Sequence, residues 1–584
     1  MTIGRNPNLH VLFGLLAVLA PLILYADAIF ATPVLDVQIG FGGHVVSERF
    51  APVRIRVEGY DSPTAATLLI IQSLGNPWRG AATVRQQPTL AVAIDGVYHT
   101  TIPIYDPLNP IRIALVDSNG ATLAEQEVNL RPTRHLDPFP LTYGILPHPL
   151  SPDGIPPIHI TELPKDWWAL DAAQSLWISG APPQSEWDTI EQWVFAGGSV
   201  VIFSGSDFFR LDSPVVRRLL PLRDPILVTA PPAIAHLAGT RKTGSDTVLR
   251  RAGVPLLVIR RYGAGYVALV TVRGADLTRD ELGLVANTIP TTTRLTLADF
   301  AERELGELPV VRPGHPAALL LGLGGVAGLA ACGAIGRKHR LSGVLAALGL
   351  CVFGSVWSGF YVNRNHTVVP LYSISTSLSL HALFGSYVDT SSFVWPRTAR
   401  FVDIAARESI PVQIVTTPPG NDPLASLMPA SQASPTLFEH SFLEGRISVP
   451  MQSGARKTFF SCRASPSLLQ LAYDDTLDVF VLHQGLGEAI DEAWLILDGF
   501  GFHITSVPHG TIVYSQEAVR SLRELTSLAS SSSQSALRFL SDIFPFDRGV
   551  WLIGRSARWV ESREEPIRKV RLVSLHVAEG VHNE

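Results

Sequence analysis

The sequence predicts a multidomain membrane protein with an immunoglobulin-like β-sandwich, a flavodoxin-like α/β domain, a two-helix transmembrane hairpin and a C-terminal mainly-β domain. Two observations lead to this fold class. Residues 316–336 and 341–362 contain no Asp, Glu, Lys or Arg, and each is close to the roughly 20 apolar residues that cross a bilayer as a helix. Elsewhere, short alternating runs between turn residues predict strands, and one stretch among them has a helical period.

The membrane topology follows from a basic tetrad between the two uncharged stretches. Arg337, Lys338, His339 and Arg340 separate the predicted helices, and basic residues in short loops are retained on the cytoplasmic side. The hairpin 316–362 therefore has its turn 337–340 in the cytoplasm. The large parts before and after it are predicted to be extracytoplasmic (periplasmic), in a multi-pass protein of a bacterial cell membrane.

Small residues are spaced for close helix packing inside the hairpin. Gly324 and Gly328 form a GxxxG pair in the first helix, and Ser355 and Gly359 have the same spacing in the second. Small residues let helix backbones approach closely within lipid. Two interpretations remain: the hairpin helices pack on each other, or they pack on helices of another envelope membrane protein.

Residues 1–31 have the pattern of a signal peptide or of an uncleaved N-terminal anchor. Arg5 precedes an apolar run from Val11 to Tyr25, and Ala26-Asp27-Ala28 is a small-x-small cleavage pattern. Either interpretation places the following segment outside the cytoplasm.

Composition limits the classes of function. A chain of 584 residues is too long for one core. The net charge is −5, and no basic run occurs beyond the tetrad, so a nucleic-acid partner is not expected. Cys332 and Cys351 lie in the predicted membrane helices and leave Cys462 alone, which excludes a disulfide framework. No metal, cofactor or catalytic residue is predicted, because no such motif has the required spacing.

Residues 32–135 are predicted to form the immunoglobulin-like β-sandwich. Alternating runs such as Val53–Gly59, Ala66–Ser73 and Ile111–Gly120 recur at a spacing of roughly ten residues. Asn119-Gly120 is a strong hairpin signal. The Cys…Trp…Cys signature is missing, so only the architecture is predicted.

Residues 136–312 change to an α/β pattern. Apolar runs at Leu141–Pro147, Ala172–Gly180 and Ser199–Gly205 predict buried strands, as in a parallel sheet covered on both faces. Gln184–Ala196 predicts a helix that ends at Gly197-Gly198. The residues on its apolar face are Trp187, Ile190, Trp193 and Val194.

This region resembles a known family. The run LPKDWWAL…LWISG…QSEWDTIEQWVFAGGSVVIFSG, followed by RRYGAGYVALVTV, is similar to the class I glutamine amidotransferase-like domains of uncharacterised bacterial membrane proteins. The resemblance covers Leu141–Ala286 and implies an extracytoplasmic flavodoxin-like fold. Amidotransferases need a cysteine nucleophile on a strand-to-helix elbow. No cysteine occurs between Met1 and Ala331, so the resemblance does not extend to glutaminase chemistry.

Residues 366–584 return to short strands and predict an extracytoplasmic mainly-β domain. Helices are predicted at Gln516–Leu525 and around Ser535–Ile543, and the low-complexity run Ser530–Ser533 is predicted to be a flexible connection.

Ser204 and Ser206 follow a predicted strand, where an α/β enzyme could present a nucleophile. A Gly-x-Ser-x-Gly elbow around Ser204 would need glycine at position 202, which is Ile202, so a plain turn is favoured. Similarly, Gly263-Ala264-Gly265 mimics a dinucleotide fingerprint but is predicted to be a hairpin turn, because a β-rich run follows it.

The leading hypothesis is a non-enzymatic, membrane-anchored envelope protein that binds or scaffolds partners through its extracytoplasmic domains. Its expected partners are the lipid bilayer and other envelope membrane proteins. The alternative hypothesis is an extracytoplasmic serine hydrolase that uses the Ser204/Ser206 loop.

Overall fold

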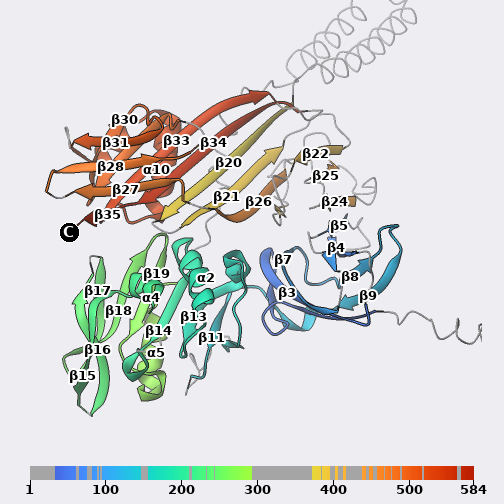
Figure 1. Ribbon diagram of the computed structural model, residues 1–584, viewed down its shortest axis with the longest axis horizontal. Helices are drawn as coiled ribbons and strands as arrows, with labels where there is room; N and C mark the ends of the chain where they lie inside the picture. Colours follow the sequence, from blue (N-terminus) through green and yellow to red (C-terminus); the bar gives the residue numbers. More distant parts are fainter. Residues whose placement is uncertain are drawn as a thin grey trace, which may run out of the picture. The chain divides into compact units, whose positions relative to one another are not determined.

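The structure is a computed structural model. It describes residues 33–146, 156–291 and 467–583 with short internal gaps, together with separate strands between residues 371 and 465. The chain divides into two compact units, one of Met1–Asp137 with Ala433–Gly445 and one of Pro138–Gln432 with Arg446–Glu584. The described part is mainly β, and one of its mixed parallel and antiparallel sheets is the centre of an α/β region with flanking helices (Figure 1).

The predicted N-terminal segment 1–31 and the predicted hairpin 316–362, with its tetrad and its small residues, lie outside the described residues. Among the helices that are described, none combines the length and the apolar character needed to span a bilayer. The membrane topology therefore stays a prediction.

The first unit is built from two principal sheets. One is antiparallel and contains β1 (Val34–Ile39), β3 (Arg49–Glu58) and β7 (Gly96–Ile104). The other includes β4 (Ala66–Leu74), β5 (Ala82–Gln87), β8 (Ile111–Val116) and β9 (Thr122–Val128). β24 (Leu437–Ser441) pairs in parallel with β5, so a segment far along the chain completes this unit.

Alternation along the strands produces the core of the first unit. Val53, Ile55 and Val57 of β3 and Leu68 and Ile70 of β4 belong to one buried cluster, because every second side chain of a strand points to the same face. The predicted Asn119-Gly120 hairpin is confirmed. It joins β8 to β9, and Gly120 has a positive φ of +81°, whereas Asn119 does not have a positive φ.

The second unit begins with a seven-stranded sheet. Its order is β12 (Ile158–Ile160), β11 (Phe139–Tyr143), β13 (Ala173–Ile178), β14 (Ser199–Phe203), β19 (Gly265–Val270), β18 (Val254–Tyr262) and β17 (Ser245–Arg251). The pairs from β12 to β19 are parallel, and the pairs of β18 are antiparallel. β15 (Leu222–Ala230) and β16 (Ile234–Arg241) form a separate hairpin.

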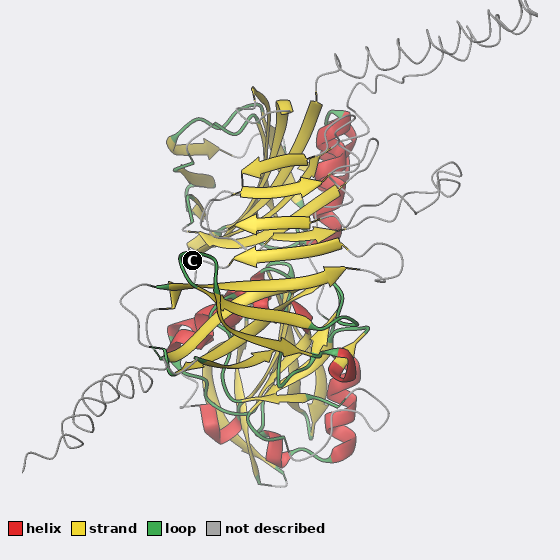
Figure 2. Cartoon of the chain, turned by 90° about the vertical axis from the view of Figure 1, so that its right-hand side faces the viewer, coloured by secondary structure: helices red, strands yellow, loops and turns green. Residues whose placement is uncertain are grey.

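Helices lie on both sides of this sheet (Figure 2). α5 (Arg279–Thr288) begins with a capping box between Thr278 and Glu281 and buries Leu282 and Val285 beside Val201. α2 (Gln184–Phe195) also contacts β14 and β19, but its buried side chains are not part of that cluster. The alternation of β14 therefore indicates that α2 packs on the opposite face.

The predicted core face of α2 is confirmed, since Trp187, Ile190, Trp193 and Val194 are all buried. A Cβ atom on Gly198 would lie 2.3 Å from the indole of Trp193, so the glycine that follows the helix makes room for that ring.

The predicted hairpin at Gly263-Ala264 is also confirmed, because Tyr262 and Gly265 pair across it. A Cβ atom on Gly265 would lie 2.1 Å from the carbonyl oxygen of Val194. The turns at Gly197-Gly198 and Gly263-Ala264-Gly265, both within the run that resembles the known family, thus pack against the end of α2.

The C-terminal part of the second unit contains two further sheets. The larger runs β23 (Val412–Val415), β26 (Lys457–Ser465), β21 (Gly385–Val394), β20 (Leu371–Ala382), β34 (Ile567–Glu579), β33 (Val550–Glu561), β29 (Glu492–Leu497), β30 (Phe500–Ile504) and β32 (Arg520–Ser521). The smaller runs β31 (Gly510–Ser515), β28 (Val479–Gln484), β27 (Leu469–Asp474) and β35 (Val581–Asn583). One buried cluster contains residues of both sheets.

Among the described residues of this part, the helices are α9 (Leu522–Leu528) and α10 (Ser531–Ile543). The prediction that Ser530–Ser533 is a flexible connection is wrong, because Ser530 caps α10 and accepts a hydrogen bond from the Ser533 backbone. Serine is a preferred N-cap residue. A serine run therefore suits a helix start as well as a linker.

Candidate functional site

Ser204, one of the two predicted hydrolase residues, is fully buried at the end of β14. Its hydroxyl donates to the carbonyl oxygen of Val270 at 3.0 Å, and its backbone N–H reaches the same oxygen at 3.1 Å. Ser204 thus ties β14 to the neighbouring β19 and is not presented to solvent.

Ser206 is exposed in the short turn Gly205–Asp207. Among the described residues, no hydrogen bond joins its hydroxyl to a histidine or a carboxylate. The turn contacts β16, which carries the buried His236. The Nδ1 atom of His236 lies 3.2 Å from Thr271 Oγ1. Burial, aided by the charge of Arg251, lowers the pKa of His236. No sequence spacing pointed to this histidine, because sheet pairing brings it here.

The carboxyl edge of the parallel strands is closely packed. Gly144 follows β11 with φ +85°, and a Cβ atom there would lie 2.9 Å from the carbonyl carbon of Ser179. Gly205 has φ +60°, and its Cβ would lie 2.8 Å from the Arg273 nitrogen. Ligands of open α/β sheets bind outside this edge. Here the loops that follow the strands pack backbone against backbone.

A partly buried ion pair links α2 to its neighbours in the same region. Glu191 is 6% exposed and accepts two hydrogen bonds from Arg218, at 3.0 and 2.7 Å, and one from the Tyr262 hydroxyl at 2.7 Å. Burial raises the pKa of Tyr262, and the charge of Glu191 adds to the effect. The tyrosine therefore remains a protonated donor, and this cluster joins α2, α4 (Pro214–Leu219) and β18.

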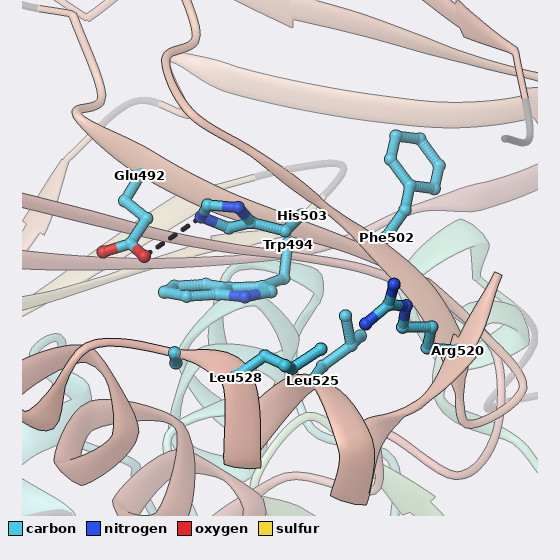
Figure 3. Close-up of a pocket in the computed structure, with 8 residues that line it drawn as sticks. Glu492, Trp494, Phe502, His503, Arg520, Leu525 and Leu528 are labelled. Atoms are coloured by element: carbon cyan, nitrogen blue, oxygen red, sulfur yellow. Dashed lines mark hydrogen bonds and ion pairs between the residues drawn. The ribbon is translucent and has the colours of Figure 1, made fainter. Parts of the chain in front are cut away.

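A pocket lies in the C-terminal part, between β29, β30, β32 and α9, with a cavity volume of about 390 Å³. Ala529 and Phe502 contribute to its lining. The other residues that line it are Glu492, Trp494, His503, Arg520, Leu525 and Leu528 (Figure 3).

Strand alternation places the pocket residues on one face. Ala493 and Leu495 of β29 point into the core between the sheets, so Glu492 and Trp494 lie on the opposite face. His503 is the cross-strand partner of Trp494, and their ring centroids are 5.4 Å apart. The Phe502 ring turns to the other side of β30 (Figure 3), where it packs against Phe480.

Glu492 is engaged by two neighbours. Its Oε1 lies 3.0 Å from Nε2 of His503, and its Oε2 accepts a hydrogen bond from the hydroxyl of Ser533. A serine, a histidine and an acid thus meet, but the acid is in the middle. A catalytic triad needs the histidine between the other two, and Ser533 is fully buried. The arrangement positions His503 and the start of α10.

Arg520 differs from these tied groups. It is exposed, and its guanidinium points toward the pocket (Figure 3). In the part of the chain that the structure describes, it has no ion pair or side-chain hydrogen bond. The Ser521–Glu524 capping box starts α9 directly after it. α9 supplies the buried Leu525 and the 62% exposed Leu528 to the apolar wall.

Within the described ranges, no group of three His, Cys, Asp or Glu side chains is arranged to hold a metal ion. No family model, no curated protein and no solved structure matches the chain. The interpretation of the pocket therefore depends on its own geometry.

Proposed function

We propose that this chain is a non-enzymatic, membrane-anchored envelope protein that binds or scaffolds partners through extracytoplasmic domains, with the pocket beside Arg520 as a binding site. The observation that supports this proposal most is a contrast in hydrogen bonding. Ser204, Glu492 and Ser533 are tied to neighbours in structural contacts. The guanidinium of Arg520, in contrast, borders a cavity beside an apolar wall.

The membrane part of the proposal rests on the sequence. The uncharged stretches 316–336 and 341–362 and the tetrad between them favour a two-helix anchor with both large parts in the periplasm. Its partners would be the lipid bilayer and other envelope membrane proteins.

The finer fold assignments belong to the same proposal. Numbered along the chain, the parallel strands have the order 2-1-3-4-5, which is the flavodoxin order. This order supports an amidotransferase-like α/β domain that has kept its fold without the cysteine nucleophile. In the first unit, the core shared by two sheets supports an immunoglobulin-like sandwich.

A serine-directed fluorophosphonate probe tests the enzymatic alternative. The full chain, purified in a nonionic detergent, should not be labelled, and it should release no ammonia from glutamine. Labelling that disappears in Ser206→Ala would establish the serine hydrolase and overturn the non-enzymatic proposal. Ammonia release above a heat-inactivated control would show that the chain hydrolyses glutamine, and it would also overturn the non-enzymatic proposal.

Labelling of introduced cysteines tests the topology. Ser206→Cys and Ser531→Cys should react with a membrane-impermeant maleimide in intact cells, whereas His339→Cys should react only after lysis. The parent chain is labelled in parallel to subtract the signal of Cys462. Protection of the position-531 cysteine before lysis would contradict the two-helix hairpin.

A further inference from the structure

The two charged side chains that border the pocket, Glu492 and Arg520, differ in how many hydrogen bonds they already make. Glu492 is the acid in the lining, and both of its carboxylate oxygens are already engaged, one by His503 and one by Ser533. The positive charge of Arg520 has no counter-ion among the described residues. A ligand that matches the pocket therefore brings a negative group to Arg520.

The geometry of arginine favours a particular kind of negative group. A guanidinium presents planar pairs of N–H donors that match the two oxygens of a carboxylate. A cationic ligand group would instead need Glu492. Glu492 already has two of its acceptor sites in use, by His503 and Ser533, whereas the donors of Arg520 are unused among the described residues.

The rest of the lining is suited to an apolar group. Trp494 and Leu525 are buried at the pocket, and Leu528 exposes most of its side chain beside them. Ligand sites are typically lined by apolar and aromatic side chains with a few polar groups that fix orientation. The cavity of about 390 Å³ is near the small end of the range of about 300–1,000 Å³ for such sites.

We propose that this pocket binds a small anionic amphiphile, a carboxylate joined to an aromatic or branched aliphatic group, with the carboxylate on Arg520 and the apolar group against Trp494, Leu525 and Leu528. Two sources share this chemistry, a free organic acid and the carboxyl end of a peptide that finishes in an apolar residue. The inference rests on the proposed function, because it names the ligand of the same pocket.

Calorimetric titration of the full chain in nonionic detergent tests the inference, with blank micelles subtracted. The probes are 3-phenylpropionate, its neutral amide 3-phenylpropanamide and the cation 3-phenylpropylamine. We expect the acid to bind at least about tenfold more tightly than the amide, and the amine to bind most weakly. The acid's advantage should shrink as salt is added, because salt screens exposed charges.

Variants of the pocket distinguish the contribution of the carboxylate to binding from that of the apolar group. Arg520→Gln should remove the difference between acid and amide, whereas Arg523→Gln, a change at an exposed arginine of α9, should preserve it. Leu528→Ser should weaken the acid and the amide alike. All three positions are exposed, and an unchanged melting temperature confirms that each variant folds.

A pentapeptide ending in Phe, with a free or an amidated carboxyl end, distinguishes the two sources. Tighter binding of the free-acid peptide than of 3-phenylpropionate identifies a chain end, and the reverse order identifies a small acid. Equal binding of acid and amide, tightest binding of the amine, or binding of no probe would overturn the inference. The probe-labelling and glutamine assays decide the proposed function independently, because neither involves the pocket.

Discussion

The carboxyl edge of the α/β sheet and the pocket face of the C-terminal sheet carry similar side chains but use them differently. At the edge, Ser204 is buried and bonded to Val270, and His236 is buried with its Nδ1 beside Thr271 Oγ1, while its Nε2 has no partner among the described residues. At the pocket, Glu492 is engaged in the same manner, but Arg520 points toward the cavity. By analogy of fold, the first place would be expected to hold the site. The difference between the two places is exposure: the unpartnered nitrogen of His236 is buried, whereas the guanidinium of Arg520 is exposed beside a cavity. Fold alone does not define function.

The two regions also differ in how they bury polar groups. In the α/β region, Glu191, Arg218 and Tyr262 satisfy one another. In the C-terminal region, His381 of β20 and His576 of β34 are buried with ring centroids 5.8 Å apart. Their four ring nitrogens have no hydrogen-bond partner among the described residues. The described α/β region buries His236 in a similar way, whereas the C-terminal region buries a pair of histidines. We therefore expect the stability of the C-terminal region to depend more strongly on pH than that of the α/β region.

The largest expected effect concerns packing in the α/β region. Trp193→Ala should lower the free energy of unfolding of the α/β region by roughly 3–5 kcal/mol, through lost burial and the cavity left behind. Domain stabilities are about 5–15 kcal/mol, so the melting temperature should fall clearly. Leu284→Ala, at an exposed position of α5, is the control. A Trp193→Ala chain that melts like the parent would show that the surrounding side chains relax to fill the space that the indole leaves.

The next effect concerns the buried histidines. Burial lowers the pKa of His381 to about 3, with repulsion from His576 adding to it, and burial lowers the pKa of His576 to about 4. Both values lie below the ordinary 6.5. Between pH 6.5 and about 4 the unfolded chain therefore binds more protons than the folded chain, and stability falls as the pH falls. Each histidine contributes about 1.4 kcal/mol per pH unit.

We expect the C-terminal region to lose about 2–3 kcal/mol of stability between pH 7 and pH 5.5. Denaturant midpoints over this range measure the loss. His509→Gln, at an exposed histidine, should leave the pH slope unchanged, whereas replacing His381 by Asn should make it shallower. A midpoint that does not move with pH would mean that the two rings have partners, such as water or a metal ion.

The sequence predicts those helices and turns whose residues follow a local pattern, such as the spacing of apolar residues along a helix. Helix α2 and its buried face followed from the spacing of Trp187 and Trp193, and the Asn119-Gly120 turn followed from the hairpin preference of that pair. Pairing between distant segments could not be predicted, because it leaves no local period. An example is the parallel contact of β24 with β5.

The pocket was missed for the same reason. His503 meets Trp494 only through the register of β29 with β30, and Arg520 reaches the pocket only through the pairing of β32 with β30. One local signal was available. The pattern Ser521-x-x-Glu524 is a capping box, which would have moved the predicted helix start from Gln516 to Leu522.

Two glycines provide a matched test of local packing at smaller magnitude. Gly198→Ala should cost about 1–3 kcal/mol, because the new methyl group would overlap the Trp193 ring. Gly283→Ala should instead stabilise α5 by about 0.5–1 kcal/mol, since nothing lies within 4 Å of its Cβ and alanine favours the helix. Opposite shifts in melting temperature are expected. A Gly198→Ala chain that melts at or above the temperature of the parent would show that the indole can move away from position 198.

The smallest expected effect comes from removing a helix N-cap, and the same kind of cap occurs in both regions. Thr278 starts α5 and Ser521 starts α9, and each forms a capping box with a glutamate three residues later. Replacing either residue by Ala should cost about 1 kcal/mol locally. α5 buries Leu282 and Val285 in a larger core, whereas α9 buries Leu525 alone. Packing therefore holds α5 in place after the cap is lost, and α9 loosens.

The consequence can be measured as binding. Ser521→Ala should weaken the affinity for 3-phenylpropionate, because α9 carries Leu525 and Leu528 of the apolar wall. Thr278→Ala should leave the affinity unchanged, although its expected cost in stability is similar. Equal affinities in both variants would show that contacts other than the cap hold α9 against the sheet. The pocket wall would then be as rigid as the α/β core, contrary to the difference drawn between the two regions.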